Sequence, residues 1–104
     1  MVICARAAAG RDPETTLGTA KPYYEQTIEV LDQDSTNLSK SRVAAYIESY
    51  RYLGYYNFLK AYSEEAVQFP AKAKEYKDNT RLYWNKMLEF DPNNKDIEEA
   101  LKTL

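Results

Sequence analysis

The sequence lacks histidine entirely and contains one cysteine, three glycines and four prolines in 104 residues. Without histidine, the chain has no copy of the side chain that most often serves as a general base or metal ligand. The single thiol, Cys4, cannot form a disulfide within the chain. So few glycines and prolines exclude a collagen-like or linker sequence. No apolar run approaches the ~18 residues expected of a membrane span, so we expect none.

Charge of neither sign dominates, because 14 basic and 16 acidic residues give a net charge of −2. A dedicated nucleic-acid-binding domain usually carries a strongly basic face, so we expect no nucleic-acid partner. The opening residues, Met1 to Cys4, lack the basic region and long apolar core of a signal peptide. We interpret them as the cut end of a longer chain. The expected location is the cytoplasm by default, or the periplasm or cell envelope if the parent protein is exported.

Helical periodicity dominates the sequence, and strand-like alternation is scarce. The three longest segments with this pattern are 20–31, 40–61 and 71–90. Pro70 is placed as the first residue of the third helix, where its missing N–H costs little. Residues 62–69 fit either a loop or a short helix capped by Ser63. An alanine-rich helix at 5–9 and a short helix from Lys95 complete an all-α fold of about four or five helices.

The ten tyrosines are the most unusual feature of the composition. Six of them crowd one predicted helix and its end: Tyr46, Tyr50, Tyr52, Tyr55, Tyr56 and Tyr62. Rings at these positions point almost all round the helix axis, so neighbouring helices must cover two of its sides. We therefore expect 40–61 to be a central helix. Because six rings cannot all face inward, some of them are expected at a surface that contacts a partner.

Two stretches carry a repeat motif: Tyr50-x-x-Leu53-Gly54-x-x-Asn57, and Thr80-x-x-x-Trp84 followed by the ending Leu88-Glu89-Phe90-Asp91-Pro92-Asn93-Asn94. They resemble the tetratricopeptide (TPR) repeat, Trp-x-x-Leu-Gly-x-x-Tyr, then Ala-x-x-x-Phe, then Pro. An earlier half repeat begins with Ala20-x-x-x-Tyr24 and has Gln33 in place of the proline. From Ala20 onward, the chain is similar to the C-terminal part of TPR proteins that are common in Gram-negative bacteria of the gut.

The resemblance implies a short right-handed array of antiparallel helix hairpins in one domain, 1–104, closed by a C-terminal helix. About 1–37 would form a degenerate helix pair, 38–92 a degenerate repeat, and 93–104 the capping helix. More residues separate the two halves of the motif than one repeat's turn should contain. We expect an insertion near 61–74, either as a long inserted loop or as an extension of the repeat's first helix. The residues expected to pack the repeats together are Tyr24, Tyr50, Leu53, Gly54, Trp84 and Pro92.

Signals for chemistry are weak along the whole chain. Glu64-Glu65 and Glu98-Glu99 are neighbours that point ~100° apart on a helix, so they are interpreted as solvated helix faces. The acidic stretch 32–36 lacks the glycine and the distant glutamate of a calcium loop. A small basic patch is also interpreted as a solvated face; it consists of Lys72, Lys74 and Lys77 beside Tyr76. We therefore expect no enzyme activity, no cofactor and no metal site.

In the TPR family, the first helix of each pair lines a concave groove. The resemblance therefore implies four groove-facing residues: Glu48, Arg51, Tyr55 and Phe58. Aromatic and arginine side chains are also preferred at the energetic centres of interfaces. The predicted function is a non-catalytic protein–protein interaction or scaffold module that binds a peptide or helix in this groove. The alternative is a structural segment that caps a longer repeat array or self-associates as a homodimer.

Overall fold

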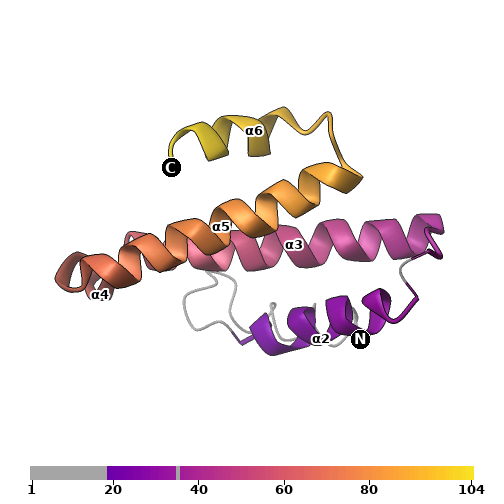
Figure 1. Cartoon of the computed structure of the whole chain (residues 1–104), viewed down its shortest axis with the longest axis horizontal. Coiled ribbons are helices and arrows are strands. Elements are labelled where there is room, and N and C mark those ends of the chain that lie inside the picture. The colour runs from indigo at the N-terminus through magenta and orange to yellow at the C-terminus, as the bar shows by residue number, and fades with distance from the viewer. Residues whose placement is uncertain (1–18, 35) are drawn as a thin grey trace.

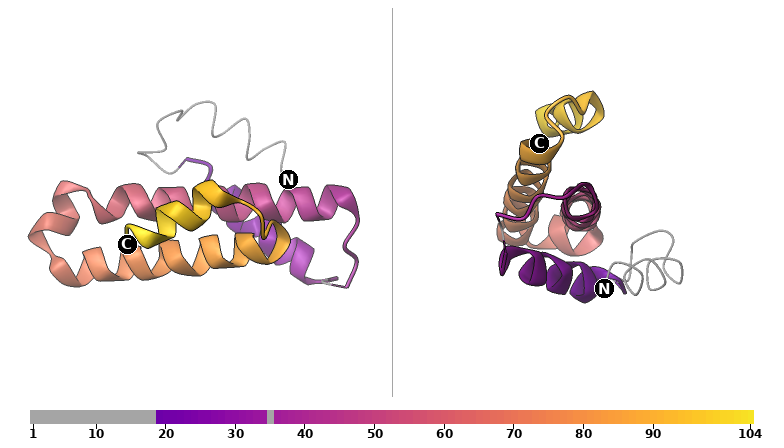
Figure 2. Two further views of the ribbon diagram at one scale, coloured as in Figure 1. Left: turned by 90° about the horizontal axis from the view of Figure 1, so that it is seen from above. Right: turned by 90° about the vertical axis from the view of Figure 1, so that its right-hand side faces the viewer.

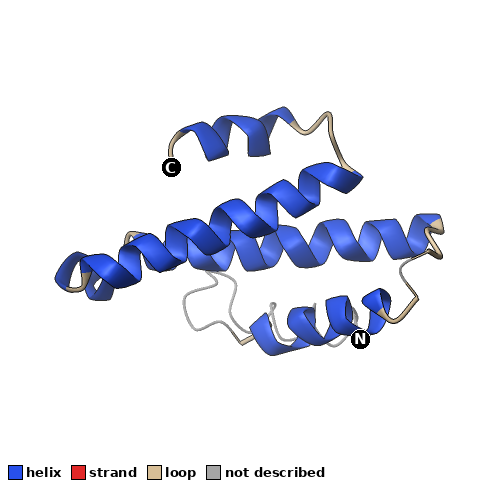
Figure 3. Ribbon diagram, in the orientation of Figure 1, coloured by secondary structure: helices blue, strands red, loops and turns tan. Residues whose placement is uncertain are grey.

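The computed structural model describes residues 19–34 and 36–104, and across these ranges the chain forms five α-helices and no strand (Figures 1 and 3). The helices are α2 (Lys21–Asp32), α3 (Lys40–Ala61), α4 (Glu64–Gln68), α5 (Pro70–Phe90) and α6 (Lys95–Lys102). The all-α fold class is confirmed. The alanine-rich stretch 5–9, and with it the first helix of the predicted pair at 1–37, lies outside the described residues.

Helix ends are set by local signals that the sequence carries. Pro22 lies in the first turn of α2 and Pro70 opens α5, at positions where proline costs no helical hydrogen bond. Ser39, Ser63 and Asn94 cap α3, α4 and α6, each accepting a hydrogen bond from the backbone N–H three residues later. The predicted helices 20–31, 40–61 and 71–90 therefore begin and end within about one residue of α2, α3 and α5.

The prediction of an inserted loop near 61–74 is wrong, because most of these residues are helical. After α3 ends at Ala61, only Tyr62 and Ser63 precede α4, and only Phe69 separates α4 from α5. The extra residues are therefore mostly helical, because Ser63 caps α4 and Pro70 starts a new helix at once. The alternative of a short helix capped by Ser63 is the one that the structure contains.

Helix α3 lies between α2 and α5 and runs antiparallel to both (Figures 1 and 2). Contacts between α3 and α5 run in opposite chain directions, from Tyr46 with Phe90 to Asn57 with Asn79. On the other side, Tyr46 reaches Asp32 near the end of α2. The prediction that 40–61 is a central helix covered on two sides is confirmed. The last helix, α6, packs on the far side of α5.

The core forms mainly where α2, α3 and α5 meet, and it uses the apolar faces expected from the periodicity. Its buried apolar side chains are Ala20, Tyr24, Leu31, Tyr46, Tyr50, Leu53, Ala61, Ala66, Trp84 and Met87. The ring of Tyr46 stacks on that of Phe90 at 4.6 Å between centroids, and Tyr50 packs against Tyr83 at 6.2 Å. Stacked tyrosines thus fill much of the seam between α3 and α5.

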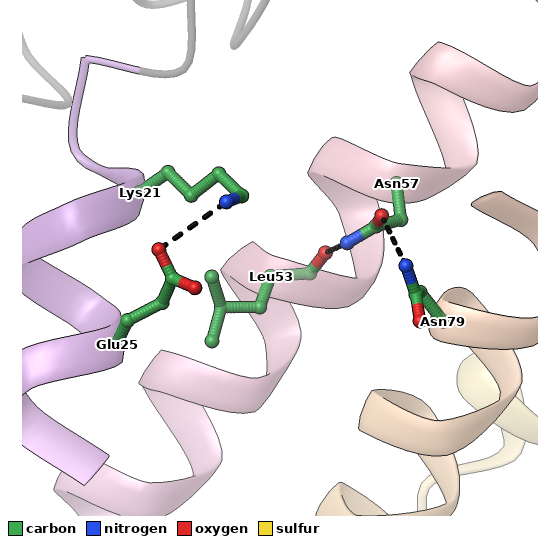
Figure 4. A network of polar contacts seen from close by, with 5 residues as sticks. All are labelled: Lys21, Glu25, Leu53, Asn57 and Asn79. Carbon is green, nitrogen blue, oxygen red and sulfur yellow. Dashed lines mark hydrogen bonds and ion pairs between the residues drawn. The ribbon is translucent and has the colours of Figure 1, made fainter. Parts of the chain in front are cut away.

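A short polar network crosses the same seam (Figure 4). The buried Asn57 amide donates to the backbone carbonyl of Leu53 at 2.8 Å, and its Oδ1 accepts from Asn79 Nδ2 at 3.4 Å. At the next residue of α5, Thr80 Oγ1 lies 3.3 Å from the carbonyl oxygen of Gly54. The motif position usually held by tyrosine therefore carries a buried amide that fixes the register of the two helices.

The connection between α2 and α3 is held by one guanidinium. Arg42 donates to three backbone carbonyl oxygens, those of Leu31 at 2.9 Å, Asp34 at 3.2 Å and Asn37 at 2.8 Å. The last carbonyls of a helix have no partner within the helix, and here a side chain from the next helix supplies one. The angle between α2 and α3 is thereby fixed at its turn.

Burial of the core tyrosines makes the fold sensitive to high pH. Burial, with a hydrogen bond to Asp32, raises the pKa of Tyr46 to about 12, and burial also raises that of Tyr50 to about 12. Below pH 10 both folded and unfolded chains hold neutral phenols, and this stabilisation is complete. Above that pH the unfolded chain loses its protons first, so stability falls until the folded-state value of about 12 is reached.

We therefore expect urea midpoints to decrease steadily between pH 10 and 12, measured by circular dichroism together with tyrosinate absorbance. A Tyr46→Phe, Tyr50→Phe variant should show a clearly weaker decrease, because two of the titrating groups are gone. Tyr23→Phe, a change at an exposed ring, is the matched control and should follow the wild type. An equal pH dependence in the core variant and the wild type would show that Tyr46 and Tyr50 do not cause the loss of stability.

Candidate protein-binding groove

The side of α3 that carries Glu48, Arg51 and Tyr55 forms a partly exposed stripe, which continues to Tyr62 directly after the helix. Its members recur at helical spacing, and two of them are large rings, Tyr55 at 43% and Tyr62 at 55% exposed. Arg51 is exposed on the same face, and Glu48 is half-buried at its edge. Because residues three, four and seven apart share one side of a helix, this stripe forms a single surface.

A hollow opens along this stripe, and α2, α5 and α6 each contribute to its walls. Its lining consists of Tyr24, Glu48, Arg51, Tyr52, Tyr55, Trp84 and Ile97. Three of the four residues predicted to face a groove, Glu48, Arg51 and Tyr55, therefore lie around one hollow. We call this hollow the aromatic groove, since four of its seven lining residues are aromatic.

The fourth predicted residue, Phe58, does not line the aromatic groove. Its ring stacks on Trp84 at 5.6 Å between centroids and meets Tyr62 at 5.2 Å, and it is half-buried. Phe58 thus supports the floor of the groove from one turn further along α3. Phe58 was predicted to face the groove because it lies on the same side of α3 as Arg51 and Tyr55. In the structure its ring packs against the bulky ring of Trp84, beside the hollow.

The floor of the aromatic groove is a rigid indole. Trp84 is 4% exposed, and its ring lies directly against the Cα of Gly54, where any added Cβ would overlap the ring atoms Cδ1 and Nε1. The indole N–H also donates to the backbone carbonyl of Arg51 at 3.4 Å. The absence of a side chain at Gly54 thus permits close approach of α5, through its tryptophan.

The wall on the α2 side is fixed by a tyrosine. Tyr24 Oη donates to Glu48 Oε2 at 3.0 Å, and its ring packs on that of Tyr52 at 4.6 Å between centroids. Glu48 is therefore held by α2, so its carboxylate has a defined orientation at the groove edge. This contact links a residue predicted to pack repeats with one predicted to face the groove.

Five of the six residues predicted to pack repeats together are buried. Tyr24, Tyr50, Leu53, Gly54 and Trp84 are all buried at contacts among α2, α3 and α5. Pro92 is exposed in the turn after α5 and makes no buried contact of this kind. Its position directly after Asp91 prevents α5 from continuing, so it acts by ending the helix.

Sequence reasoning missed two contributors to the surface. Ile97, in the short helix expected from Lys95, was not among the residues predicted to face a groove, yet it lines the aromatic groove. Lys77 was placed in a solvated basic patch, but its ammonium lies 5.5 Å from the centre of the Tyr62 ring. The angle at which α6 and α5 pass α3 decides both placements, and no local pattern encodes that angle. The one sequence signal for a contact of Ile97 was its strongly apolar side chain in the first turn of α6.

Among residues 19–34 and 36–104, no group of three or more histidine, cysteine, aspartate or glutamate side chains is close enough to hold a metal ion. None of the helices in the same ranges is long and apolar enough to cross a bilayer.

Comparisons with protein-family models, with curated proteins and with solved structures found no match to this chain. The function is therefore inferred from the geometry of the groove and the residues that line it.

Proposed function

We propose that this chain is a TPR-like, non-catalytic protein-interaction module that binds a peptide or helix in the aromatic groove. The observation that supports it most is the convergence of Glu48, Arg51 and Tyr55 around one hollow, as the repeat resemblance implies. The stacking order of antiparallel hairpins also agrees with such a repeat, in which α3 would be the groove-lining helix and α5 its partner.

The side chains at the groove are suited to contact rather than to bond chemistry. They offer aromatic rings, one exposed guanidinium and one carboxylate that already accepts a hydrogen bond from Tyr24. Tyrosine, tryptophan and arginine are the residues that most often carry binding energy at interfaces. A shallow surface of this composition fits a helix or extended peptide that buries a few apolar side chains.

The proposal is tested by affinity capture from a lysate of the source cells, with the wild-type chain and an Arg51→Ala, Tyr55→Ala variant as baits. Both positions are exposed, so the variant should keep its helical circular dichroism. A protein retained by the wild type and lost by the variant is the expected result. A Tyr23→Ala, Lys86→Ala variant removes one exposed ring and one exposed cation elsewhere, and it should retain the protein. Equal capture by all three baits would contradict the groove.

The alternative function, a cap that closes an array or self-associates, is favoured by one feature of α6. Ile97, Leu101 and Leu104 form a half-buried apolar edge, whereas Glu98, Glu99 and Lys102 are exposed. A terminal repeat needs this kind of polar outer face. Light scattering of a Tyr55→Ala, Phe58→Ala variant separates the two functions. Loss of an oligomer favours self-association, and an unchanged mass with a lost partner favours the groove.

A further inference from the structure

A second hollow lies beside α4 and carries an excess of positive charge. Its lining consists of Ala66, Pro70, Ala73, Lys74, Lys77, Asp78 and Arg81. Three cations thus face one carboxylate, although the whole chain carries a net charge of −2. We call it the basic hollow. The contrast with the acidic chain shows that positive charge is concentrated at this place on the surface.

The two hollows are joined by a continuous series of contacts. From the floor of the aromatic groove, Trp84 stacks on Phe58 at 5.6 Å, and Phe58 meets Tyr62 at 5.2 Å. The ammonium of Lys77, which lines the basic hollow, lies 5.5 Å from the centre of the Tyr62 ring. An extended partner seated against the exposed ring of Tyr55 can therefore continue past Phe58 and the exposed ring of Tyr62 to the lysines.

Several of the cations along this path remain available for a partner. Within the described part of the chain, neither Arg51 nor Lys74 forms an ion pair. Arg81 is engaged by Asp78 at 3.0 Å and by the carbonyl oxygen of Leu104 at 2.7 Å, so it holds the hollow in shape. The one carboxylate of the lining is thus largely neutralised by Arg81, and the lysines determine the local charge.

We propose that the partner is a peptide with an aromatic or apolar anchor flanked on one side by aspartate or glutamate residues. The anchor occupies the aromatic groove, and the acidic flank lies over Lys74 and Lys77, towards α4. This inference rests on the proposed function and adds the chemistry and direction of the ligand. Apolar contact supplies the affinity, while charge complementarity at the rim selects the partner and speeds its encounter.

The test uses a displayed library of random peptides, selected in parallel on three baits. They are the wild-type chain, a Lys74→Glu, Lys77→Glu variant, and a Lys40→Glu, Lys86→Glu variant that makes the same change of charge at exposed positions elsewhere. The wild type and the second variant are expected to enrich peptides with an apolar anchor and an acidic flank. The first variant should lose that preference or select basic flanks instead.

The best enriched peptide is then labelled and titrated by fluorescence anisotropy. Binding to the Lys74→Glu, Lys77→Glu variant should be weaker on the order of tenfold, and added salt should reduce this difference because exposed charges are screened. Apolar anchors enriched without any acidic preference would overturn this inference and leave the groove intact. No enrichment above an Arg51→Ala, Tyr55→Ala bait would overturn the inference and the proposed groove together.

Discussion

Replacing Trp84 by alanine is expected to lower the free energy of unfolding by about 3–5 kcal/mol, which is a large part of the stability of so small a domain. The ring is 4% exposed and contacts Gly54 and Phe58, so its removal loses apolar burial and leaves a cavity. The hydrogen bond from the indole to the carbonyl of Arg51 is lost as well. The seam between α3 and α5 would then lose the ring that packs against Gly54.

Urea unfolding followed by circular dichroism measures this loss. Leu82→Ala is the matched control, since Leu82 lies on the same helix and is 53% exposed. It should change the free energy of unfolding by less than about 1 kcal/mol. A Trp84→Ala variant as stable as Leu82→Ala would show that the indole does not fill the seam as described.

Replacing Gly54 by alanine is expected to destabilise the fold by about 2–3 kcal/mol, although alanine is the better helix former by about 1 kcal/mol. The reason is steric. A Cβ at this position would overlap Cδ1 and Nε1 of Trp84, and a rigid buried ring cannot move aside without displacing α5. Close packing in the interior makes such an overlap costly even for one methyl group.

A double-mutant cycle separates the steric cause from any other. In a Trp84→Ala background the ring is absent, so Gly54→Ala should become neutral or stabilising, as helix propensity alone predicts. Thermal and urea unfolding of the four proteins give the coupling between the two sites. If Gly54→Ala costs the same free energy in both backgrounds, the contact with Trp84 is not its cause.

Helix positions were predictable because their signals are local. Pro22 and Pro70 lie where proline opens a helix, Ser39 precedes α3 as its cap, and Asp91 and Pro92 end α5. Apolar spacing then indicated the buried face of each helix, including Tyr24 and Leu31 of α2. The error near 61–74 arose from reading extra length as loop, although Ser63 and Pro70 already marked the ends of a short helix.

The candidate groove was only partly predictable. Glu48, Arg51 and Tyr55 share one face of α3, and helical spacing alone places them together. Ile97 and Lys77 join this surface through the packing of α5 and α6, which depends on contacts far apart in the sequence. The same holds for Arg42, whose three carbonyl partners lie 5 to 11 residues before it, in a turn with no recognisable motif.

The arrangement of α6 has a consequence for how the groove opens. No residue of α6 is fully buried, whereas α3 is covered on two sides and Trp84 is almost completely enclosed. Regions with little buried apolar surface open locally at a lower free energy than the core does. We therefore expect the wall that carries Ile97 to open locally at a lower free energy than the floor formed by Trp84, so that the width of the groove varies while the core stays folded.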